Sequence, residues 1–210
     1  MKLAVITNER LKSAFLSKPL SEKTRVVFVE SPQQVPADAV VIDLLFDCSQ
    51  DRIEQLKQFL PLPVFVNAVT HTLRYIGQPF VRVNAWPGFL NNPFVEVVAP
   101  PAQEAMVKNV FDALGWQYQL VPDITGMISA RIISTIINEA YYTLADKISS
   151  KEDIDIAMKL GTHYPYGPFE WSKRIGLKNI HELLIQLGKE DNLYQVADLL
   201  TTEMIAENAH

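Results

Sequence analysis

The strongest constraint on the fold is a change in the spacing of apolar residues close to Pro122. Before it, short apolar runs such as residues 3–6 and 94–98 alternate with segments of helical spacing. Such alternation is typical of a sheet whose strands are joined by helices that cover its faces. After Pro122 only helical spacing is found. We therefore predict two domains, an α/β domain over residues 1–122 and an all-α domain over residues 123–210.

The second domain is expected to be a helix bundle. A helical pattern over residues 126–149 is apolar on most of its sides, which places this helix inside the bundle. Three further helical patterns follow, over residues 151–161, 179–188 and 193–207. Gly161 is expected to stop the first of these, because glycine often follows the last residue of a helix.

Charge and composition exclude several functions. The net charge of −5 comes without any basic run, which argues against nucleic-acid binding and against attraction to anionic membranes. No apolar run approaches the roughly 20 residues of a membrane span. A single cysteine, Cys48, cannot form an internal disulfide, so we predict a cytoplasmic protein. No spacing of His, Cys, Asp and Glu suggests a metal site.

One short stretch has a residue pattern that would rarely occur by chance. GTHYPYGPFEW, at residues 161–171, follows KEDIDIAMKLG, and INEA occurs at Ile137–Ala140 in the preceding helical pattern. An acid-rich helix start, then AMKLG and then YPxGPFE is the pattern of the C-terminal domain of the 3-hydroxyacyl-CoA dehydrogenase family. The chain resembles this family clearly over residues 123–186, whereas its first domain is shorter and matches weakly.

The resemblance carries several expectations. It implies a Rossmann-like fold for the first domain and NAD-dependent oxidation of a 3-hydroxyacyl-CoA, a step of fatty-acid metabolism. It also implies a His–Glu pair for proton transfer, an acyl-CoA ligand and a homodimer formed through the helical domain. Backbone and packing needs alone explain the GTHYPYGPFEW stretch: its prolines fix φ, and its aromatic residues can pack against the long helix.

The cofactor loop departs from the family pattern. A dinucleotide fold needs GxGxxG after its first strand, because glycines let the backbone approach the pyrophosphate. This chain has Thr7, Asn8 and Glu9 there, and no glycine up to Lys12. Glu9 puts a carboxylate where an anion should bind. Glu30 falls where a ribose-binding acid would lie, although a solvated acid at a strand end is the simpler interpretation. We therefore predict no cofactor, or NAD if the chain is an active enzyme.

The residues at the positions of the catalytic pair also depart from the family pattern. In the family, a strand ending in HFFNP supplies the histidine, and a glutamate follows about a dozen residues later. The matching stretch, VNAWPGFLNNPFVEVV, has Asn84 at the histidine position and Glu96 at the glutamate position. Asparagine does not titrate near neutral pH, so it cannot act as a general base. The family's GFxxNR asparagine is replaced by Ala130, whereas Arg131 is kept. His71, in the loop after the fourth strand, is the alternative base.

Three hypotheses follow. In the first, the chain is a family member that has lost, or nearly lost, dehydrogenase activity and binds an acyl-CoA-like ligand or acts as a dimeric interaction protein. In the second, it is an active NAD(P)-dependent oxidoreductase with an altered cofactor loop, in which His71 or Glu96 is the base. In the third, it is a structural or regulatory partner that binds no small ligand.

Overall fold

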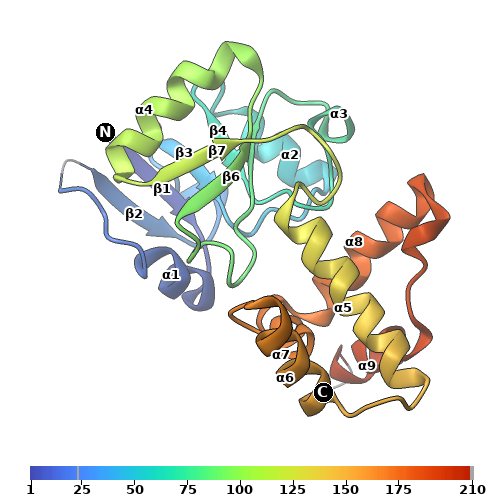
Figure 1. The fold of residues 1–210 in the computed structure, drawn as a ribbon. Coiled ribbons are helices and arrows are strands. Elements are labelled where there is room, and N and C mark those ends of the chain that lie inside the picture. Colours follow the sequence, from blue (N-terminus) through green and yellow to red (C-terminus); the bar gives the residue numbers. More distant parts are fainter. Residues whose placement is uncertain (23, 209–210) are drawn as a thin grey trace. The chain divides into compact units, whose positions relative to one another are not determined.

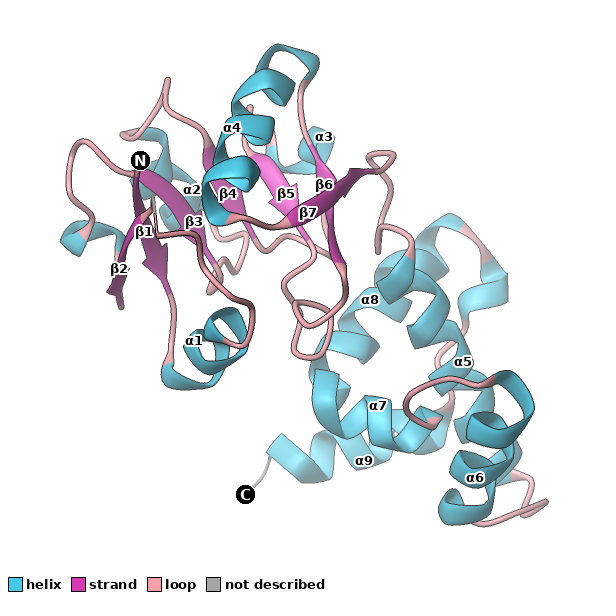
Figure 2. Cartoon of the chain, turned by 60° about the vertical axis from the view of Figure 1, so that its left-hand side comes forward, coloured by secondary structure: helices cyan, strands magenta, loops and turns pink. Residues whose placement is uncertain are grey.

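The alternating apolar runs of the first region form one sheet in the computed structural model, which describes residues 1–22 and 24–208. The chain divides into two units, Met1–Met127 and Ile128–His210 (Figure 1). Strands are found in the first unit, and the described part of the second unit is helical (Figure 2). The predicted fold class, a Rossmann-like α/β domain followed by an all-α domain, is confirmed.

Over the described residues the sheet has seven strands in the order β2-β1-β3-β4-β5-β6-β7. The strands are β1 (Lys2–Ile6), β2 (Arg25–Val29), β3 (Val40–Asp43), β4 (Val64–Val66), β5 (Val81–Val83), β6 (Phe94–Val98) and β7 (Gln117–Leu120). The first five are parallel, β6 runs antiparallel to β5, and β7 runs parallel to β6. The strand order reverses at β1, and in open α/β sheets ligands bind beside such a reversal.

Helices cover both faces of this sheet because apolar side chains of the inner strands alternate between two clusters. The helices are α1 (Glu9–Leu16), α2 (Gln50–Lys57), α3 (Leu73–Ile76) and α4 (Glu104–Leu114), with short 3₁₀ helices η1 (Pro32–Gln34) and η2 (Pro101–Gln103). Val5 lies in a cluster with residues of α1 and α4, whereas Ile6 lies in a cluster with residues of α2 and α3. Ser49 caps α2, and its Oγ accepts from Arg52 N at 3.2 Å.

The second unit is built around one central helix. Its elements are α5 (Ser129–Ala145), α6 (Lys151–Thr162), α7 (Pro168–Ile175), α8 (Leu177–Glu190), the 3₁₀ helix η3 (Asn192–Tyr194) and α9 (Asp198–Asn208). Helix α5 packs against α7, α8 and α9, which confirms that the long isoleucine-rich helix belongs inside the bundle. It is shorter than predicted, because Met127 (φ 52°) and Lys147 (φ 56°) have left-handed backbones on either side of it.

Two helix ends were predicted wrongly. Gly161 lies inside α6, and the helix instead ends at His163, whose left-handed backbone (φ 58°) lets its N–H reach Lys159 O at 3.1 Å. The single helix predicted over residues 193–207 is broken between η3 and α9. Asn138 causes this break from α5, because its amide donates to Gln195 O at 2.7 Å and accepts from Ala197 N at 2.9 Å.

Candidate functional site

Polar side chains meet where the central strands end. Asn67 directly follows β4, and its backbone N–H donates to Asp43 O at 2.9 Å. Its side-chain amide donates to Leu44 O at 3.3 Å and accepts from Ala85 N at 3.0 Å. Asn67 therefore ties together the exits of β3, β4 and β5, and so positions the backbone next to Asn84.

Two of the predicted catalytic candidates lie in direct contact. Asn84 Nδ2 donates to Glu96 Oε2 at 3.1 Å, and Asn84 N donates to Glu96 O at the same distance. The two residues are only 2% and 6% exposed. The twelve-residue spacing thus brings an amide and a carboxylate together on neighbouring strands. Such a pair can hold a ligand, but the amide cannot accept a proton near neutral pH as an imidazole would.

The third candidate, His71, lies on the loop between β4 and α3. Its Nδ1 is 2.8 Å from Thr70 Oγ1, and its ring stacks on Tyr75 with centroids 4.5 Å apart. Which atom donates in the Thr70–His71 bond depends on the imidazole tautomer. Both residues are partly exposed, so the loop presents a hydroxyl–imidazole pair near the carboxyl end of β4.

A buried arginine holds this loop in place. The fully buried Arg82 donates from Nε to Ala68 O at 2.8 Å and from Nη2 to Val69 O at 3.1 Å. Its Nη1 pairs with Asp123 at 2.5 Å. Burial lowers the pKa of the guanidinium, and Asp123 opposes that shift. Arg82 was not among the residues predicted to be functional; its signal in the sequence is a lone charge inside an apolar strand run.

Side chains of the connection between β1 and α1 form hydrogen bonds with its own backbone. Asn8 caps α1, because its Oδ1 accepts from Leu11 N at 2.9 Å. Thr7 N donates to Val29 O at 2.9 Å, and Thr7 Oγ1 donates to Asn8 O at 3.1 Å. Glu9 stands in the first helical turn, where it pairs with Lys12 at 3.2 Å. Side chains and local contacts therefore take up donors that a phosphate group would need.

A hollow of about 440 Å³ lies beside this connection, near the reversal of strand order. Its lining residues are Thr7, Asn8, Glu9, Lys12, Phe28, Val29, Glu30 and Leu45. The predicted cofactor positions are thus grouped together, with Glu30 directly after β2. Lys12 Nζ lies 5.5 Å from the centre of the Phe28 ring and also pairs with Glu9, so the cationic group is already engaged.

In the helical unit, the GPFE turn is held by a buried carboxylate. Asp155 of α6 accepts from Phe169 N at 2.8 Å and from Glu170 N at 3.2 Å, which caps the start of α7. Glu170 in turn accepts from Gly167 N at 3.0 Å. A Cβ at Gly167 would overlap the Asp155 carboxylate and lie 2.5 Å from its Cα. The most specific motif of the sequence therefore has a structural role.

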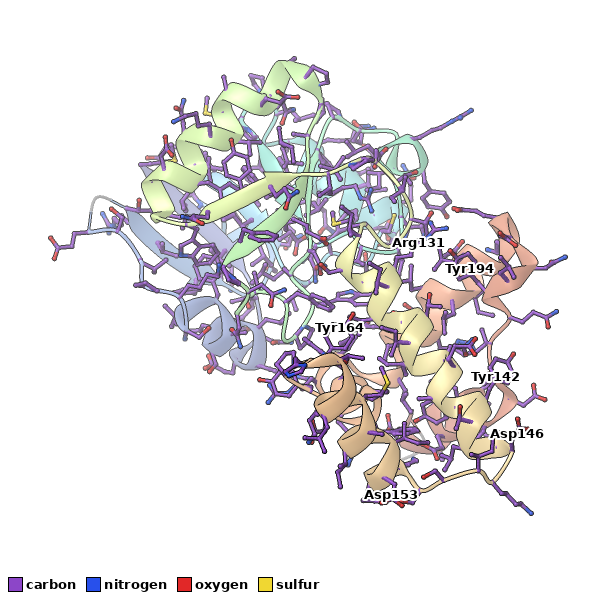
Figure 3. All side chains as sticks on the ribbon, viewed as in Figure 1. Arg131, Tyr142, Asp146, Asp153, Tyr164 and Tyr194 are labelled. Carbon is purple, nitrogen blue, oxygen red and sulfur yellow. The ribbon has the colours of Figure 1, made fainter. Side chains whose placement is uncertain are left out.

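Arg131 also has a structural partner. At the start of α5 its Nε and Nη2 donate to Tyr194 OH at 3.1 and 2.9 Å (Figure 3). Ala130, which stands at the position of the family's asparagine, is fully buried. The arginine kept from the family pattern therefore fastens η3 to α5.

Among the residues that the structure describes, no group of three or more His, Cys, Asp or Glu side chains could hold a metal ion. Within the same residues, every helix is too short or too polar to cross a membrane.

Sequence comparisons identify relatives. Residues 126–209 match the family model for the 3-hydroxyacyl-CoA dehydrogenase C-terminal domain. The chain is 36% identical to 3-hydroxyadipyl-CoA dehydrogenase of Escherichia coli over 64% of this chain and 29% of that protein. It is 33% identical to the mitochondrial hydroxyacyl-coenzyme A dehydrogenase of Homo sapiens over 71% of this chain and 48% of that protein. The chain thus spans less than half the length of these curated relatives.

Solved structures support the same fold. (S)-3-hydroxybutyryl-CoA dehydrogenase PaaH1 from Ralstonia eutropha superposes with a TM-score of 0.70 at 24% identity, covering 88% of this chain and 71% of that chain. M. tuberculosis FadB2 superposes with a TM-score of 0.73 at 18% identity, covering 87% and 70%. The resemblance to the 3-hydroxyacyl-CoA dehydrogenases is confirmed, with residues 126–209 matching the model of the family's C-terminal domain.

Proposed function

We propose that this chain is a 3-hydroxyacyl-CoA dehydrogenase-like protein whose NAD-dependent activity is lost or strongly weakened and which still binds an acyl-CoA-like ligand. The observation that carries this proposal is the hydrogen bond from Asn84 Nδ2 to Glu96 Oε2. An amide occupies the place where the resemblance puts the general base. Removal of a proton from a substrate hydroxyl needs a group that titrates near the working pH, and the amide does not.

The residues of the first βα connection support the loss of the cofactor. The resemblance implies NAD, whose pyrophosphate needs close backbone approach and free helix N–H groups. Here Asn8 occupies the N–H of Leu11, and Glu9 adds negative charge to the same helix end. These residues do not fit a pyrophosphate, so we propose that the hollow lined by Glu9 and Glu30 does not take NAD in the family's manner.

The helical unit supports a homodimer. An apolar groove of about 370 Å³ runs between α5 and α6, with Ile136, Ala140 and Met158 among its lining residues. Nearby on the same helices, Ile132 is 49% exposed and Leu160 is 75% exposed. Burying these side chains against a second copy would remove apolar surface from water.

We further propose that the protein acts in the cytoplasm.

A turnover assay tests the proposal. The purified chain is mixed with (S)-3-hydroxybutyryl-CoA and NAD or NADP, and NADH or NADPH is followed by absorbance. We expect no turnover above the background without enzyme. Enzymes typically turn over at about 1–1000 s⁻¹, so sustained turnover in that range would overturn the loss of activity. Light scattering with and without an Ile132→Glu, Leu160→Glu double substitution tests the dimer.

The second candidate function is an active oxidoreductase with an atypical cofactor loop. It is favoured by the Thr70–His71 pair, whose 2.8 Å contact gives the chain an imidazole near the carboxyl end of β4. This candidate requires turnover in the wild-type chain that His71→Gln abolishes. If turnover persists in His71→Gln, the imidazole is not the base.

A further inference from the structure

The amide of Asn84 presents an acceptor that the protein does not use. Asn84 Nδ2 is engaged by Glu96, and the residue is 2% exposed. Within residues 1–22 and 24–208, Asn84 Oδ1 is shielded from solvent and accepts no hydrogen bond. Buried oxygens of this kind are nearly always matched by a donor, because an unmatched one is destabilising. The group that complements Asn84 Oδ1 must therefore carry a hydrogen.

The orientation of this amide is fixed by its neighbour. An ionised carboxylate only accepts hydrogen bonds, so Glu96 must face the nitrogen of Asn84 and not its oxygen. Turning the amide over would set two acceptors against each other at about 3 Å. The oxygen of Asn84 is consequently held on the side away from Glu96 Oε2.

The backbone around Asn84 is held as firmly as its side chain. Asn84 N donates to Glu96 O at 3.1 Å, and the next residue donates from Ala85 N to Asn67 Oδ1 at 3.0 Å. These bonds come from two different strand exits. The acceptor is thus preorganised, and a ligand that uses it does not have to order it first.

We propose that Asn84 makes the site selective for acyl-CoA ligands that carry a hydroxyl group over those that carry a ketone at the same carbon. This inference rests on the proposed function, because it assumes an acyl-CoA-like ligand at the Asn84–Glu96 pair. A hydroxyl group donates to Asn84 Oδ1. A ketone oxygen only accepts, so it would meet that oxygen as acceptor against acceptor. The site is therefore a receptor for the reduced form of the ligand.

The test compares three ligands by calorimetry on the full chain without NAD. The ligands are (S)-3-hydroxybutyryl-CoA, acetoacetyl-CoA and butyryl-CoA, which share the CoA portion and differ at one carbon. We expect the hydroxy ligand to bind about tenfold or more tightly than either of the others, the effect of one well-placed hydrogen bond.

Two substitutions at the pair weaken the preference if the proposal holds. Asn84→Ala removes the acceptor, so the three ligands should bind within about threefold of one another. Glu96→Gln keeps an acceptor for Asn84 Nδ2 but adds a donor for Asn84 Oδ1, so the Asn84 amide is no longer fixed in one orientation. Its preference for the hydroxy ligand should therefore be smaller than that of the wild-type chain. Asn91→Ala is the matched control: this exposed asparagine in the same β5–β6 connection bonds only to Ser17 in the structure, and its removal should leave the preference unchanged.

The outcomes separate the two proposals. If no acyl-CoA binds, the proposed function fails and this inference fails with it. If the three ligands bind the wild-type chain equally, the proposed function stands and the role of Asn84 is wrong. A tenfold preference that persists in Asn84→Ala, with the variant folded by circular dichroism, also overturns the inference, since the preference would then not depend on the Asn84 acceptor.

Discussion

Two helix starts in this molecule are built in opposite ways. Helix α7 begins in the family's most specific motif, and its first N–H groups are capped by Asp155 from another helix, 14 and 15 residues away. Helix α1 begins at the expected cofactor loop, and its cap is Asn8, three residues from the N–H that it accepts. A start that depends on a distant carboxylate tolerates little change. A start that any local Asn, Asp, Ser or Thr can cap tolerates much more.

This difference shows how family identity and family chemistry can separate. Asp155 caps the GPFE turn, so the residues of this turn are needed for the start of α7 whether or not any reaction takes place. The connection from Thr7 to Lys12 needs glycines only if a pyrophosphate is bound. A chain that no longer binds the cofactor could replace those glycines and still form α1. The motif that identifies the relatives therefore does not report their activity.

The largest effect is expected at Gly167. Gly167→Ala would force a Cβ into the Asp155 carboxylate and to within 2.5 Å of its Cα. Both the cap and the packing around it would be disturbed, so we expect a loss of about 3 kcal/mol or more in the free energy of unfolding. Urea denaturation followed by circular dichroism measures it.

Gly161 provides the matched control in the same stretch. It lies inside α6, and a Cβ there would meet nothing within 4 Å. Gly161→Ala should therefore stabilise the chain by about 0.5–1 kcal/mol, because alanine loses less backbone entropy in a helix. Equal destabilisation by both substitutions would contradict the assigned role of Asp155.

The next largest loss of stability is expected from removing the carboxylate that caps α7. Asp155→Ala leaves Phe169 N and Glu170 N without their acceptor at a mostly buried helix start. We expect the free energy of unfolding to fall by about 2–3 kcal/mol, the cost of losing charge-assisted bonds to buried donors. Asp155→Asn keeps one acceptor oxygen, so it should lose less in the same urea titration. A loss for alanine no larger than for asparagine would break the comparison.

A smaller effect is expected at the local cap of α1. Asn8→Ala removes the bond to Leu11 N and should lower the free energy of unfolding by about 1 kcal/mol. Asn8→Ser keeps a good capping group and should stay within about 0.5 kcal/mol of wild type. If Asn8→Ser destabilises as much as Asn8→Ala, the connection is not the tolerant element described here.

The smallest effect on stability is expected at Glu9. Its side chain is 91% exposed and pairs only with Lys12 in the structure, so Glu9→Gln should change the free energy of unfolding by less than about 0.5 kcal/mol. The same urea titration measures it. A change as large as that of Asn8→Ala would mean that the first turn of α1 depends on this charge.

Local periodicity predicted most of the fold. Apolar runs such as residues 3–6 and 94–98 are set by neighbours in the chain, so their strand state follows from spacing. One error arose where a distant side chain acts on the backbone. Asn138 interrupts the last helical pattern from α5, and no local rule in residues 193–207 reveals it.

Part of the candidate site could be predicted from the sequence, and part could not. Counting along one stretch of sequence was enough to place Asn84 opposite Glu96, because the two residues lie on adjacent strands of one connection. Their functional roles stay predictions. The clamp of Arg82 on Ala68, Val69 and Asp123 joins three separate segments, so it could be recognised only once the sheet order was known.

The central claim is that the family's fold is kept while its cofactor loop has changed. Calorimetric titration of NAD into the wild-type chain tests this most directly, because it depends on neither substrate nor catalytic residues. We expect no binding heat up to millimolar NAD, since Asn8 and Glu9 occupy the helix start that would hold the pyrophosphate. Saturable binding with a dissociation constant in the micromolar range would contradict the account.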